Sequence, residues 1–393
     1  MDTTEKAALV DRPRVPVRAA GAGQFEVVVL RDAVALRSMA SEMETLAQQA
    51  IEPNVFYEPW MLAAALDSIG GEDVVIAVVR HETAGVTGVF PFEINKRFRG
   101  LPLRSMKSWR HIYCFLCTPL VAATHASGTI AALLDWVDSG KAPSKVVELD
   151  LVGGDGQFWS LLSEQMQARK WRSYAVSYER ALYKPALNQD TGVSGKHLKE
   201  LRRLERRLAE KGAYAYRALQ PGEPIQPWIE GFLELEASGW KGRERTALGS
   251  DEASRNFFTS AANGARERDR IQMLAVELDG KPIAMKCNFL SGKGSFAFKI
   301  AYDEQYSKFS PGVLLELFNM RNLLQVGADI EWMDSCALPQ HFMINRLWTE
   351  RRTITGSLLG SRGLAAMLVG QWPRYHRLRK IIEKWRQRGT NHA

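Results

Sequence analysis

The sequence predicts an α/β protein made of two similar units, each a mixed sheet flanked by helices. At 393 residues the chain has the length of two ordinary domains. Residues 25–182 and residues 232–333 repeat one order of elements, which is helix, hairpin, strand, helix and strand. We therefore expect tandem domains at residues 24–190 and 213–370.

The first unit follows a segment that lacks hydrophobic periodicity. Residues 1–23 contain Pro13, Pro16, Gly21 and Gly23, and this composition predicts a flexible arm. Beyond the arm, apolar periodicity predicts strands and helices in alternation. The expected strands are 25–30, 74–79, 86–94, 112–117, 145–151 and 174–182, and the expected helices are 33–49, 61–69, 127–138 and 158–169.

The second unit has sharper boundaries. Two helices, 232–240 and 255–266, precede strands 272–278 and 283–289, which are joined by a hairpin at Asp279-Gly280. A strand at 295–301 then leads through a polar loop into a helix at 311–325 and a strand at 328–333. Ser310 is a suitable N-cap, Pro311 suits the first helical position, and Gly327 ends the helix. A helix that begins above a strand end is a site for anions such as cofactor phosphates, although any α/β domain contains several such junctions.

Two basic helices are predicted outside the units. In the first, residues 191–212, leucines 198, 201, 204 and 208 share one face and the other face is basic. It is either a linker docked between the units or a basic lip that receives an anionic donor. The second helix, residues 371–393, has a short apolar side, which favours surface packing over binding to a membrane surface or to nucleic acid.

Composition narrows the class of protein. The net charge of +8 and a pI near 9.3 favour anionic partners, such as CoA phosphates, an acyl carrier protein, tRNA or lipid headgroups. Residues 1–6 lack an apolar signal-peptide core, and there is no apolar run long enough to span a membrane. Four cysteines give no disulfide framework, and no His pair completes a zinc site with Cys114 and Cys117. We expect a soluble cytoplasmic protein with structural thiols and no metal.

Several sequence motifs resemble the GNAT acyltransferases, and within them the CelD/BcsL-type (BioF2-like) family, which is related to the tandem-GNAT Fem transferases. The motifs after residue 194 are the most specific, and residues 194–196 and 56–60 also fit the pattern. They are Glu236-Ala237-Ser238-Gly239-Trp240-Lys241-Gly242-Arg243, Thr246-Ala247-Leu248, Phe298-Lys299, Ala301-Tyr302-Asp303-Glu304, Ser310-Pro311-Gly312, Leu314-Leu315-Glu316 and Asp334-Ser335-Cys336.

This resemblance implies a site between two parallel strands. In GNAT proteins the strand before the phosphate loop separates from the next parallel strand, and the pantetheine arm of acyl-CoA lies in the gap. Here those strands are 295–301 and 328–333. Acyl transfer needs a base and an oxyanion donor. Asp334 is the first candidate base and Asp303 the second, with Tyr302 as acid or oxyanion donor; alternatively, each of the three only caps a strand or packs nearby.

The resemblance also implies residues that bind the donor and the acceptor. The expected donor-binding residues are Lys299, Ala301, Lys308, Ser310 and Gly312. The expected acceptor-binding residues are Trp240, Lys241, Arg243 and Lys196. As alternatives, Trp240 anchors its loop in the core while the cations are solvated, and Lys299 pairs with a neighbouring carboxylate.

The expected function is transfer of an acyl group from a thioester, acyl-CoA (acetyl-CoA) or an acyl carrier protein, to a small-molecule amine, in exopolysaccharide or cell-envelope biosynthesis. The phosphate loop departs from the GNAT pattern, because residues 305–312 hold one late glycine and Pro311 supplies no N–H. A donor held chiefly by its pantetheine arm, such as an acylated carrier protein, is compatible with this loop; an aminoacyl-tRNA, as in Fem enzymes, is also compatible but is not favoured. The alternatives are thus a Fem-like aminoacyl-tRNA-dependent transferase and a catalytically silent scaffold with the GNAT fold. A peripheral membrane contact is a further expectation.

Overall fold

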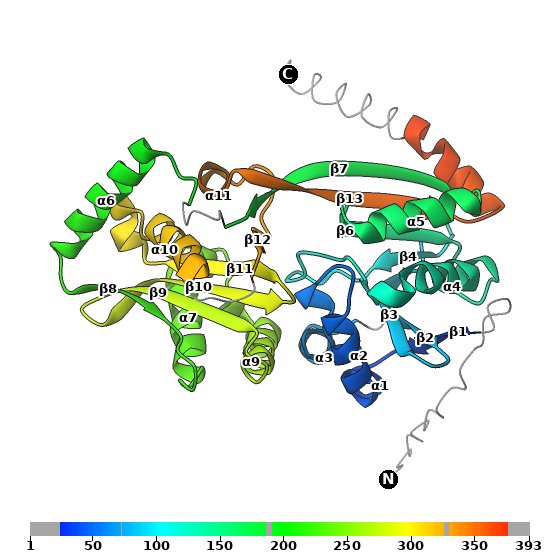
Figure 1. Cartoon of the computed structure of the whole chain (residues 1–393), viewed down its shortest axis with the longest axis horizontal. Coiled ribbons are helices and arrows are strands. Elements are labelled where there is room, and N and C mark those ends of the chain that lie inside the picture. Colours follow the sequence, from blue (N-terminus) through cyan, green and yellow to red (C-terminus); the bar gives the residue numbers. More distant parts are fainter. Residues whose placement is uncertain (1–23, 72, 186–190, 326–329, 376–393) are drawn as a thin grey trace, which may run out of the picture.

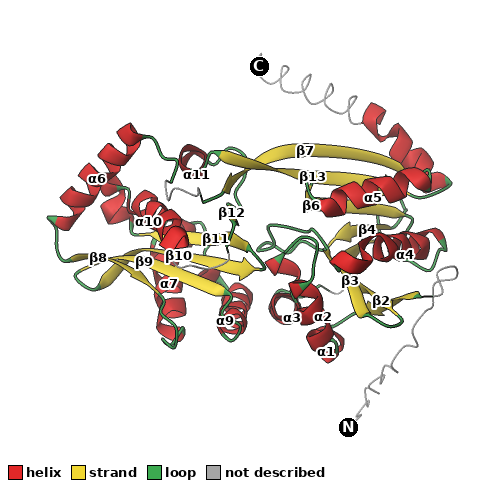
Figure 2. Ribbon diagram, viewed as in Figure 1, coloured by secondary structure: helices red, strands yellow, loops and turns green. Residues whose placement is uncertain are grey.

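The computed structural model describes residues 24–71, 73–185, 191–325 and 330–375. Their strands form one thirteen-stranded mixed sheet, with helices packed on both faces (Figures 1 and 2). The strand order is β1-β2-β3-β4-β6-β13-β7-β12-β11-β10-β9-β8, and β5 pairs with β3 at the side. The predicted α/β class is confirmed. The predicted arm, residues 1–23, lies outside the described residues.

The first unit alternates a hairpin-containing sheet with helices. Its strands are β1 (Phe25–Leu30), β2 (Val74–His81), β3 (Gly85–Asn95), β4 (Ser105–Ser108), β5 (Leu120–Val121), β6 (Val146–Gly153) and β7 (Arg172–Tyr183). Its α-helices are α1 (Ala33–Ser38), α2 (Ala40–Gln48), α3 (Pro59–Ser68), α4 (Ala126–Asp138) and α5 (Gln157–Ala168), with short 3₁₀ turns at Val55–Tyr57 and Ala123–His125.

The second unit begins after α6 (Gly195–Ala209), which is the predicted linker helix. Its strands are β8 (Tyr214–Ala218), β9 (Ile271–Leu278), β10 (Lys281–Ser291), β11 (Gly294–Tyr302), β12 (Trp332–Asp334) and β13 (Glu350–Gly360). Its helices are α7 (Gln226–Ser238), α8 (Trp240–Arg243), η3 (Leu248–Ser250), α9 (Glu252–Arg266), η4 (Glu304–Phe309), α10 (Pro311–Gln325) and α11 (Phe342–Leu347). The Asp279-Gly280 hairpin between β9 and β10 forms as predicted, with φ of 51° and 75°.

Strand β13 crosses the expected division between the units. It belongs to the second unit in sequence, but it lies between β6 and β7 of the first unit and pairs antiparallel with both. The end of β7 in turn pairs with β12, through Leu182 and Tyr183. Figure 1 shows β7 and β13 running across the molecule from one unit to the other. The two predicted sheets are therefore one continuous sheet.

A shared core also joins the two units. Helices α3 and α9 pack against each other, and the Trp60 ring lies 6.0 Å from that of Phe289 in β10. Glu58, which is buried at the start of α3, accepts hydrogen bonds from Trp60 Nε1 (2.8 Å) and Ser291 Oγ (2.6 Å) and pairs with Arg270. Because a buried carboxylate needs such partners, these contacts fix the units against each other.

One predicted strand is wrong. Residues 112–117 are irregular rather than extended, although they are apolar and mostly buried. They are part of a segment, residues 109–118, that runs alongside β6: Cys117 N–H donates to Leu151 O (3.0 Å), and the Thr118 hydroxyl accepts from Gly153 N–H (2.9 Å). Asn54 Nδ2 donates to the carbonyls of Leu116 and Thr118. The apolar run is therefore held in the core by a few main-chain and side-chain hydrogen bonds and by packing, without forming a regular strand.

Candidate functional site

The two parallel strands of the second unit separate soon after they pair. Gly294, Ser295 and Phe296 of β11 pair with residues 332–334, and β12 ends at Asp334. Strand β11 continues for six more residues, to Tyr302. Within the described residues, nothing pairs with this part of β11 on the side of β12. The expected gap between the strands is therefore present, and it runs alongside residues 297–302.

A β-bulge distorts β11 where it borders the gap. Across β10, Cys287 is opposite Lys299 and Asn288 is opposite Ala297, so Phe298 is an extra residue. The bulge turns Phe298 and Lys299 toward one face: the Tyr113 ring lies 6.2 Å from the Phe298 ring and 5.2 Å from Lys299 Nζ. Bulges disrupt the ladder and redirect side chains, and they are over-represented next to active sites. The sequence analysis did not foresee the bulge.

The structure separates the three expected catalytic residues. Asp334 is level with Phe296, whereas Tyr302 is six residues further along β11 and Asp303 follows it. At about 3.3 Å per residue, this places Tyr302 about 20 Å from the level of Asp334. Asp334 and Tyr302 therefore lie too far apart to act on one reacting carbonyl. Asp334 and the bulge lie at one end of the gap, and Tyr302 and Asp303 lie at the other.

Asp334 is completely buried and its oxygens are occupied. They accept from Arg352 (2.9 Å), from Arg180 (3.4 Å to each oxygen) and from Cys336 N–H (2.8 Å). Arg180 also donates to Phe115 O (2.7 Å), in the 109–118 segment of the first unit. A carboxylate has about four acceptor positions, and four contacts fill them here. Asp334 therefore ties the end of β12 to both units. Because its acceptor positions are already filled, it is poorly placed to take a proton from a substrate.

A second buried carboxylate contacts Lys299 of the bulge on the same face as Tyr113. Glu236 Oε1, from α7, accepts from Lys241 (2.9 Å) and from Lys299 (3.0 Å), and Oε2 accepts from Leu248 N–H (2.7 Å). Burial alone would raise the pKa of Glu236, but the two ammonium groups and the Leu248 N–H hold it below its usual value. Burial lowers the pKa of Lys299, and Glu236 only partly offsets this. Lys299 thus pairs with the carboxylate of Glu236, as the alternative expectation has it.

Lys241 also fastens α8 to the edge strand, because its Nζ donates to the Ile300 carbonyl (2.9 Å). Trp240 is 45% exposed, so it does not anchor its loop in the core. Arg243 pairs with Glu304 (2.7 Å), which also accepts from Trp240 N–H. Lys196 is exposed in the first turn of α6 and has no ion pair within the described ranges. Of the expected acceptor residues, the structure brings Trp240, Lys241 and Arg243 to the end of β11 near the gap.

The expected donor loop lies at this same end of the gap, directly after β11. Asp303 Oδ1 accepts from Gln305 N–H (2.9 Å) and so begins the 3₁₀ helix η4. Ser310 precedes α10 as expected, but with φ of 55°, a left-handed conformation that is costly for a residue other than glycine. Gly312 lies against the Tyr302 ring: a Cβ there would be 3.4 Å from Tyr302 Cδ1. Ala301 is buried, and Lys308 Nζ lies 5.1 Å from the Phe309 ring centre.

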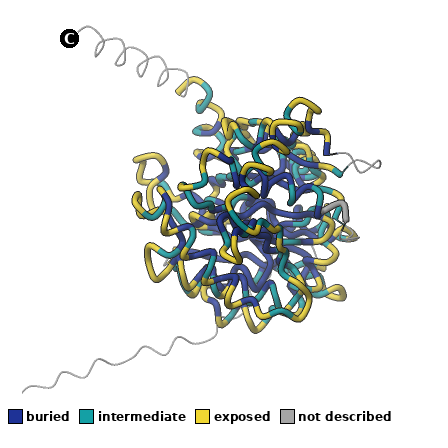
Figure 3. The backbone as a smooth tube through the Cα atoms, turned by 90° about the vertical axis from the view of Figure 1, so that its left-hand side faces the viewer, coloured by how far each residue is buried: buried dark blue, intermediate teal, exposed yellow. Residues whose placement is uncertain are grey.

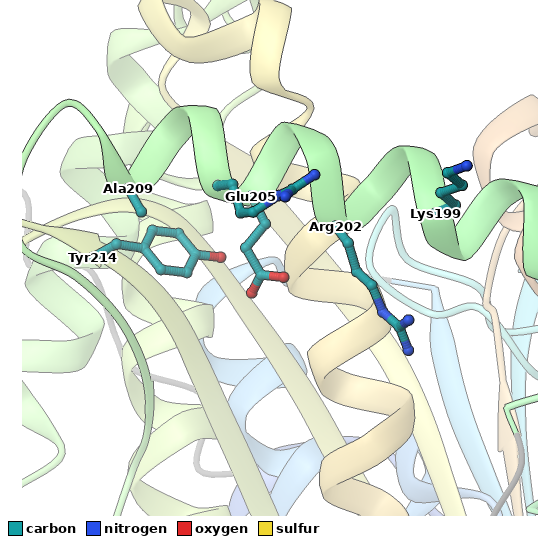
Figure 4. A pocket seen from close by; sticks show the side chains of 6 residues that line it. Lys199, Arg202, Glu205, Ala209 and Tyr214 are labelled. Carbon is teal, nitrogen blue, oxygen red and sulfur yellow. The ribbon is translucent and has the colours of Figure 1, made fainter.

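A row of cations follows the exposed face of α6. Lys199, Arg202 and Arg206 line a surface cavity of about 570 Å³ together with Glu205, Ala209 and Tyr214 of β8 (Figure 4). Figure 4 shows the Glu205 carboxylate and the Tyr214 hydroxyl turned toward each other. The three cations have no ion pair within the described residues, unlike Arg203, which pairs with Glu200 (2.6 Å). The same helix packs on the donor loop, since Arg207 lies over the Phe309 ring.

The sequence analysis also missed a buried polar network beneath α10. Lys286 Nζ donates to Glu316 Oε2 (2.8 Å), and Asn319 Nδ2 donates to Glu316 Oε1 (2.8 Å). The charges of Glu316, Lys286 and Lys241 act on His341, whose pKa is lowered by burial. Glu236 and Glu316 stand in the motifs quoted above, which is the signal that could have found them. His341 and the two arginines around Asp334 have no such signal.

The arrangement offers charge and main-chain groups but no evident metal site. No three His, Cys, Asp or Glu side chains in the described part of the chain are grouped to hold a metal ion. Cys114, Cys117 and Cys287 are buried free thiols, and Cys336 is partly buried. Beside the bulge, two ammonium groups share one carboxylate, so the cluster has an excess positive charge that can stabilise a developing oxyanion. No described helix has the length and apolar run that crossing a bilayer requires.

Comparison with known proteins agrees with this geometry. Residues 195–337 match the model of the family described as acetyltransferase (GNAT) domain. No curated protein matches the chain. The solved structure of FemX is similar in fold, with a TM-score of 0.55, 10% identity, and coverage of 81% of this chain and 95% of that one.

Two further structures are similar at the same level. The C-terminal domain (DUF2156) of a protein assigned as a lysylphosphatidylglycerol synthetase, from Agrobacterium fabrum, has a TM-score of 0.53 and 12% identity, and covers 85% of this chain and 97% of its own. A protein of unknown function from Bacteroides thetaiotaomicron has a TM-score of 0.53 and 11% identity, with 82% and 97% covered. At such identities the likeness concerns the fold alone. Residues 195–337, from α6 to just beyond β12, are thus similar to a GNAT acetyltransferase domain, and the whole chain has a two-unit fold similar to that of FemX.

Proposed function

We propose that the second unit is an N-acyltransferase that moves an acyl group from an activated donor to an amine. The observation that carries this proposal is the gap along residues 297–302, in the segment that matches the GNAT model. An unpaired strand edge offers main-chain N–H and C=O groups to an extended ligand, as a pantetheine arm is. The finer expectation, a CelD/BcsL-type protein in exopolysaccharide or cell-envelope biosynthesis, belongs to the same proposal.

The two ends of the gap have different roles in this proposal. The donor's phosphates lie at the N-terminus of α10, near Lys308, Ser310 and Gly312, and its acyl carbonyl lies at the Phe298–Lys299 bulge, about 10–13 Å along β11 from Tyr302. Lys299 and Lys241 stabilise the oxyanion that forms when the amine attacks. The acceptor enters beside Trp240, which is largely exposed and whose backbone N–H donates to Glu304, the partner of Arg243.

The attacking amine must lose a proton. His341 is suited to accept it, because burial lowers its pKa and keeps the imidazole neutral at pH 7. Nε2 takes the proton in the tautomer that carries the ring hydrogen on Nδ1, so the long contact of Nδ1 with Ile344 N–H (3.4 Å) opens when His341 acts as the base. Asp334 and Asp303 remain the predicted alternatives, and the filled oxygens of Asp334 give it a positioning role in this scheme.

A second candidate function has its own observation. Three cations that have no ion pair within the described residues lie in one row on α6, which suits a donor with repeated negative charges, and the glycine-poor loop offers few N–H groups to a pyrophosphate. An aminoacyl-tRNA donor has that property, and FemX is among the structures similar in fold. The reaction would be the same in type, with an ester in place of the thioester.

Donor preference is tested by incubating the full-length protein with a mixture of amines and one labelled donor at a time. The donors are acetyl-CoA, an acylated carrier protein and an aminoacyl-tRNA. We expect amide formation from one class, and loss of it in Lys299→Met. Transfer from the tRNA alone would support the second candidate. If no donor gives product, the alternative of a silent scaffold replaces the proposal.

A further inference from the structure

One residue of the first unit reaches the candidate site of the second. Tyr113, in the 109–118 segment, has its ring over the side chain of Lys299, with 5.2 Å from Nζ to the ring centre. Both side chains are largely buried, since Tyr113 is 5% exposed and the side chain of Lys299 is 13% exposed. Figure 3 shows buried segments, in dark blue, throughout the centre of the molecule. The contact is therefore shielded from water, which is where an ammonium group gains most from an aromatic face.

Two contacts fix the orientation of the Tyr113 ring. The ring stacks on Phe257 of α9, with 5.3 Å between the ring centres and 9° between the planes. The hydroxyl donates to Ser254 Oγ (2.7 Å), and Ser254 Oγ donates in turn to Asp251 Oδ2 (2.7 Å). Because the hydroxyl proton is already donated to Ser254, the ring offers Lys299 its face rather than a proton.

The charges around Lys299 do not by themselves favour its ammonium form. Glu236 Oε1 accepts from Lys299 (3.0 Å) and from Lys241 (2.9 Å), so one negative charge faces two positive ones. Across the ladder to β10, the residue opposite Lys299 is Cys287, a buried thiol whose pKa is raised by burial. Burial and the charge of Lys241 both lower the pKa of Lys299. An aromatic face favours the ammonium without bringing a second negative charge into the site.

We propose that Tyr113 is a positioning residue of the acyl-transfer site, which keeps Lys299 in its charged form beside the bulge. A neutral lysine would not stabilise a developing oxyanion by its charge. What Lys299 does for the substrate rests on the proposed function, whereas its charge is measurable without any substrate. The first unit then takes part in the chemistry of the second, and residues 195–337, which match the GNAT model, are not the whole site.

The test is the pKa of Lys299 in the full-length protein, measured by NMR titration of ¹³C-labelled lysine Cε. Lys299→Met identifies the signal, because that variant lacks it. We expect Tyr113→Leu and Tyr113→Met, which both remove the aromatic face, to lower the pKa of Lys299 by about 1, since a shielded cation–π contact is of that order. Tyr113→Phe keeps the face and should keep the pKa close to that of the parent protein.

The pH dependence of amide formation is a second readout. Because Lys299 acts in its charged form, kcat should fall as the pH rises through the pKa of Lys299. This fall should move to lower pH in Tyr113→Leu and stay in place in Tyr113→Phe. A role of Tyr113 in the fold alone would lower kcat at every pH without moving the fall.

A matched control lies two residues further along the same segment. The Phe115 ring contacts that of Phe298 at 5.8 Å, and no cation lies over it among the described residues. Phe115→Leu should therefore leave the pKa of Lys299 unchanged. The proposal is overturned if Tyr113→Leu and Tyr113→Met leave that pKa unchanged, if Tyr113→Phe lowers it equally, or if Phe115→Leu does. If the pKa values follow the expected order but no donor gives an amide, the proposed function fails while Tyr113 still holds the charge of Lys299.

Discussion

The two units differ at their pair of parallel strands, which is β4 and β6 in the first unit and β11 and β12 in the second. In the second unit, β11 is longer than β12 and its far edge has no strand partner. In the first unit, β4 is the short strand: only Met106 and Lys107 pair with β6, and β6 runs on to Gly153. There the 109–118 segment bonds to the free edge of β6. A topology that opens a gap in one copy is therefore closed by an irregular segment in the other.

The closing segment also serves the open gap. Tyr113 lies over Lys299 and donates to Ser254 Oγ (2.7 Å), and the Phe115 ring lies 5.8 Å from that of Phe298. The first unit therefore supplies one wall of the bulge in the second. The 109–118 segment therefore has two effects: it closes the edge of β6 in its own unit, and it shapes the gap beside β11 in the other unit.

The largest expected effect comes from removing the acid of an ion-pair cluster, which is Glu236 beside β11 and Asp150 beside β4. Glu236→Ala leaves Lys241 and Lys299 unpaired and partly buried, so we expect it to lower the free energy of unfolding by about 3–5 kcal/mol. In the first unit, Asp150 pairs with Lys107 (3.8 Å) and Arg110 (3.2 Å), which are both more than a third exposed. Asp150→Ala should therefore cost less than about 1 kcal/mol. Urea unfolding measures both, and equal losses would contradict the contrast between a buried and a solvated cluster.

The next effect separates catalysis from stability. Lys299→Met removes one of two cations beside the bulge, and we expect kcat to fall by about 100-fold with little change in KM for the donor. Lys107→Met is the matched control, because Lys107 is in β4, the counterpart of β11. It should leave kcat unchanged. A parallel rise in KM would instead give Lys299 a role in donor binding.

How far the sequence could predict this site depends on which contacts are local. Strand β1, the Asp279-Gly280 hairpin and helix α10 follow from periodicity and turn residues close in sequence, and these were predicted within a few residues. Strand β13 was missed, because Thr353, Ile354 and Thr355 give a short signal and its partners are about 180 residues away. The ion pairs of Asp334 with Arg180 and Arg352 depend on that strand exchange, so no local pattern reveals them.

The third prediction concerns pH and the closing segment. His111 is buried, its Nε2 has no hydrogen-bond partner among the described residues, and burial lowers its pKa from 6.5 to about 3. Between these two pKa values, His111 is protonated in the unfolded chain and neutral in the folded chain. His111 contributes stability above about pH 6.5, which is lost as the pH falls toward about 3. Between pH 7 and 5 this loss is about 2 kcal/mol.

His111→Phe should remove that part of the pH dependence, since phenylalanine does not titrate and the ring already packs on Phe257 at 5.1 Å. The measurement is the free energy of unfolding in urea for both proteins at the two pH values. Other titrating groups, such as Glu52 and Glu58, contribute to both proteins and cancel in the difference. If the two proteins lose stability equally, the segment does not hold a neutral imidazole.

The smallest effect tests whether α6 serves the donor, since the first unit has no described counterpart of its basic row. Arg202→Gln/Arg206→Gln should raise KM for a polyanionic donor by up to about tenfold and leave kcat unchanged, because exposed charges contribute modestly and mainly to encounter. Arg203→Gln is the control on the same helix, since Glu200 already pairs with Arg203. Added salt should erase the difference between the parent and the double variant. A salt-independent loss of kcat would instead mean that α6 supports the fold of the donor loop through its contact with Phe309.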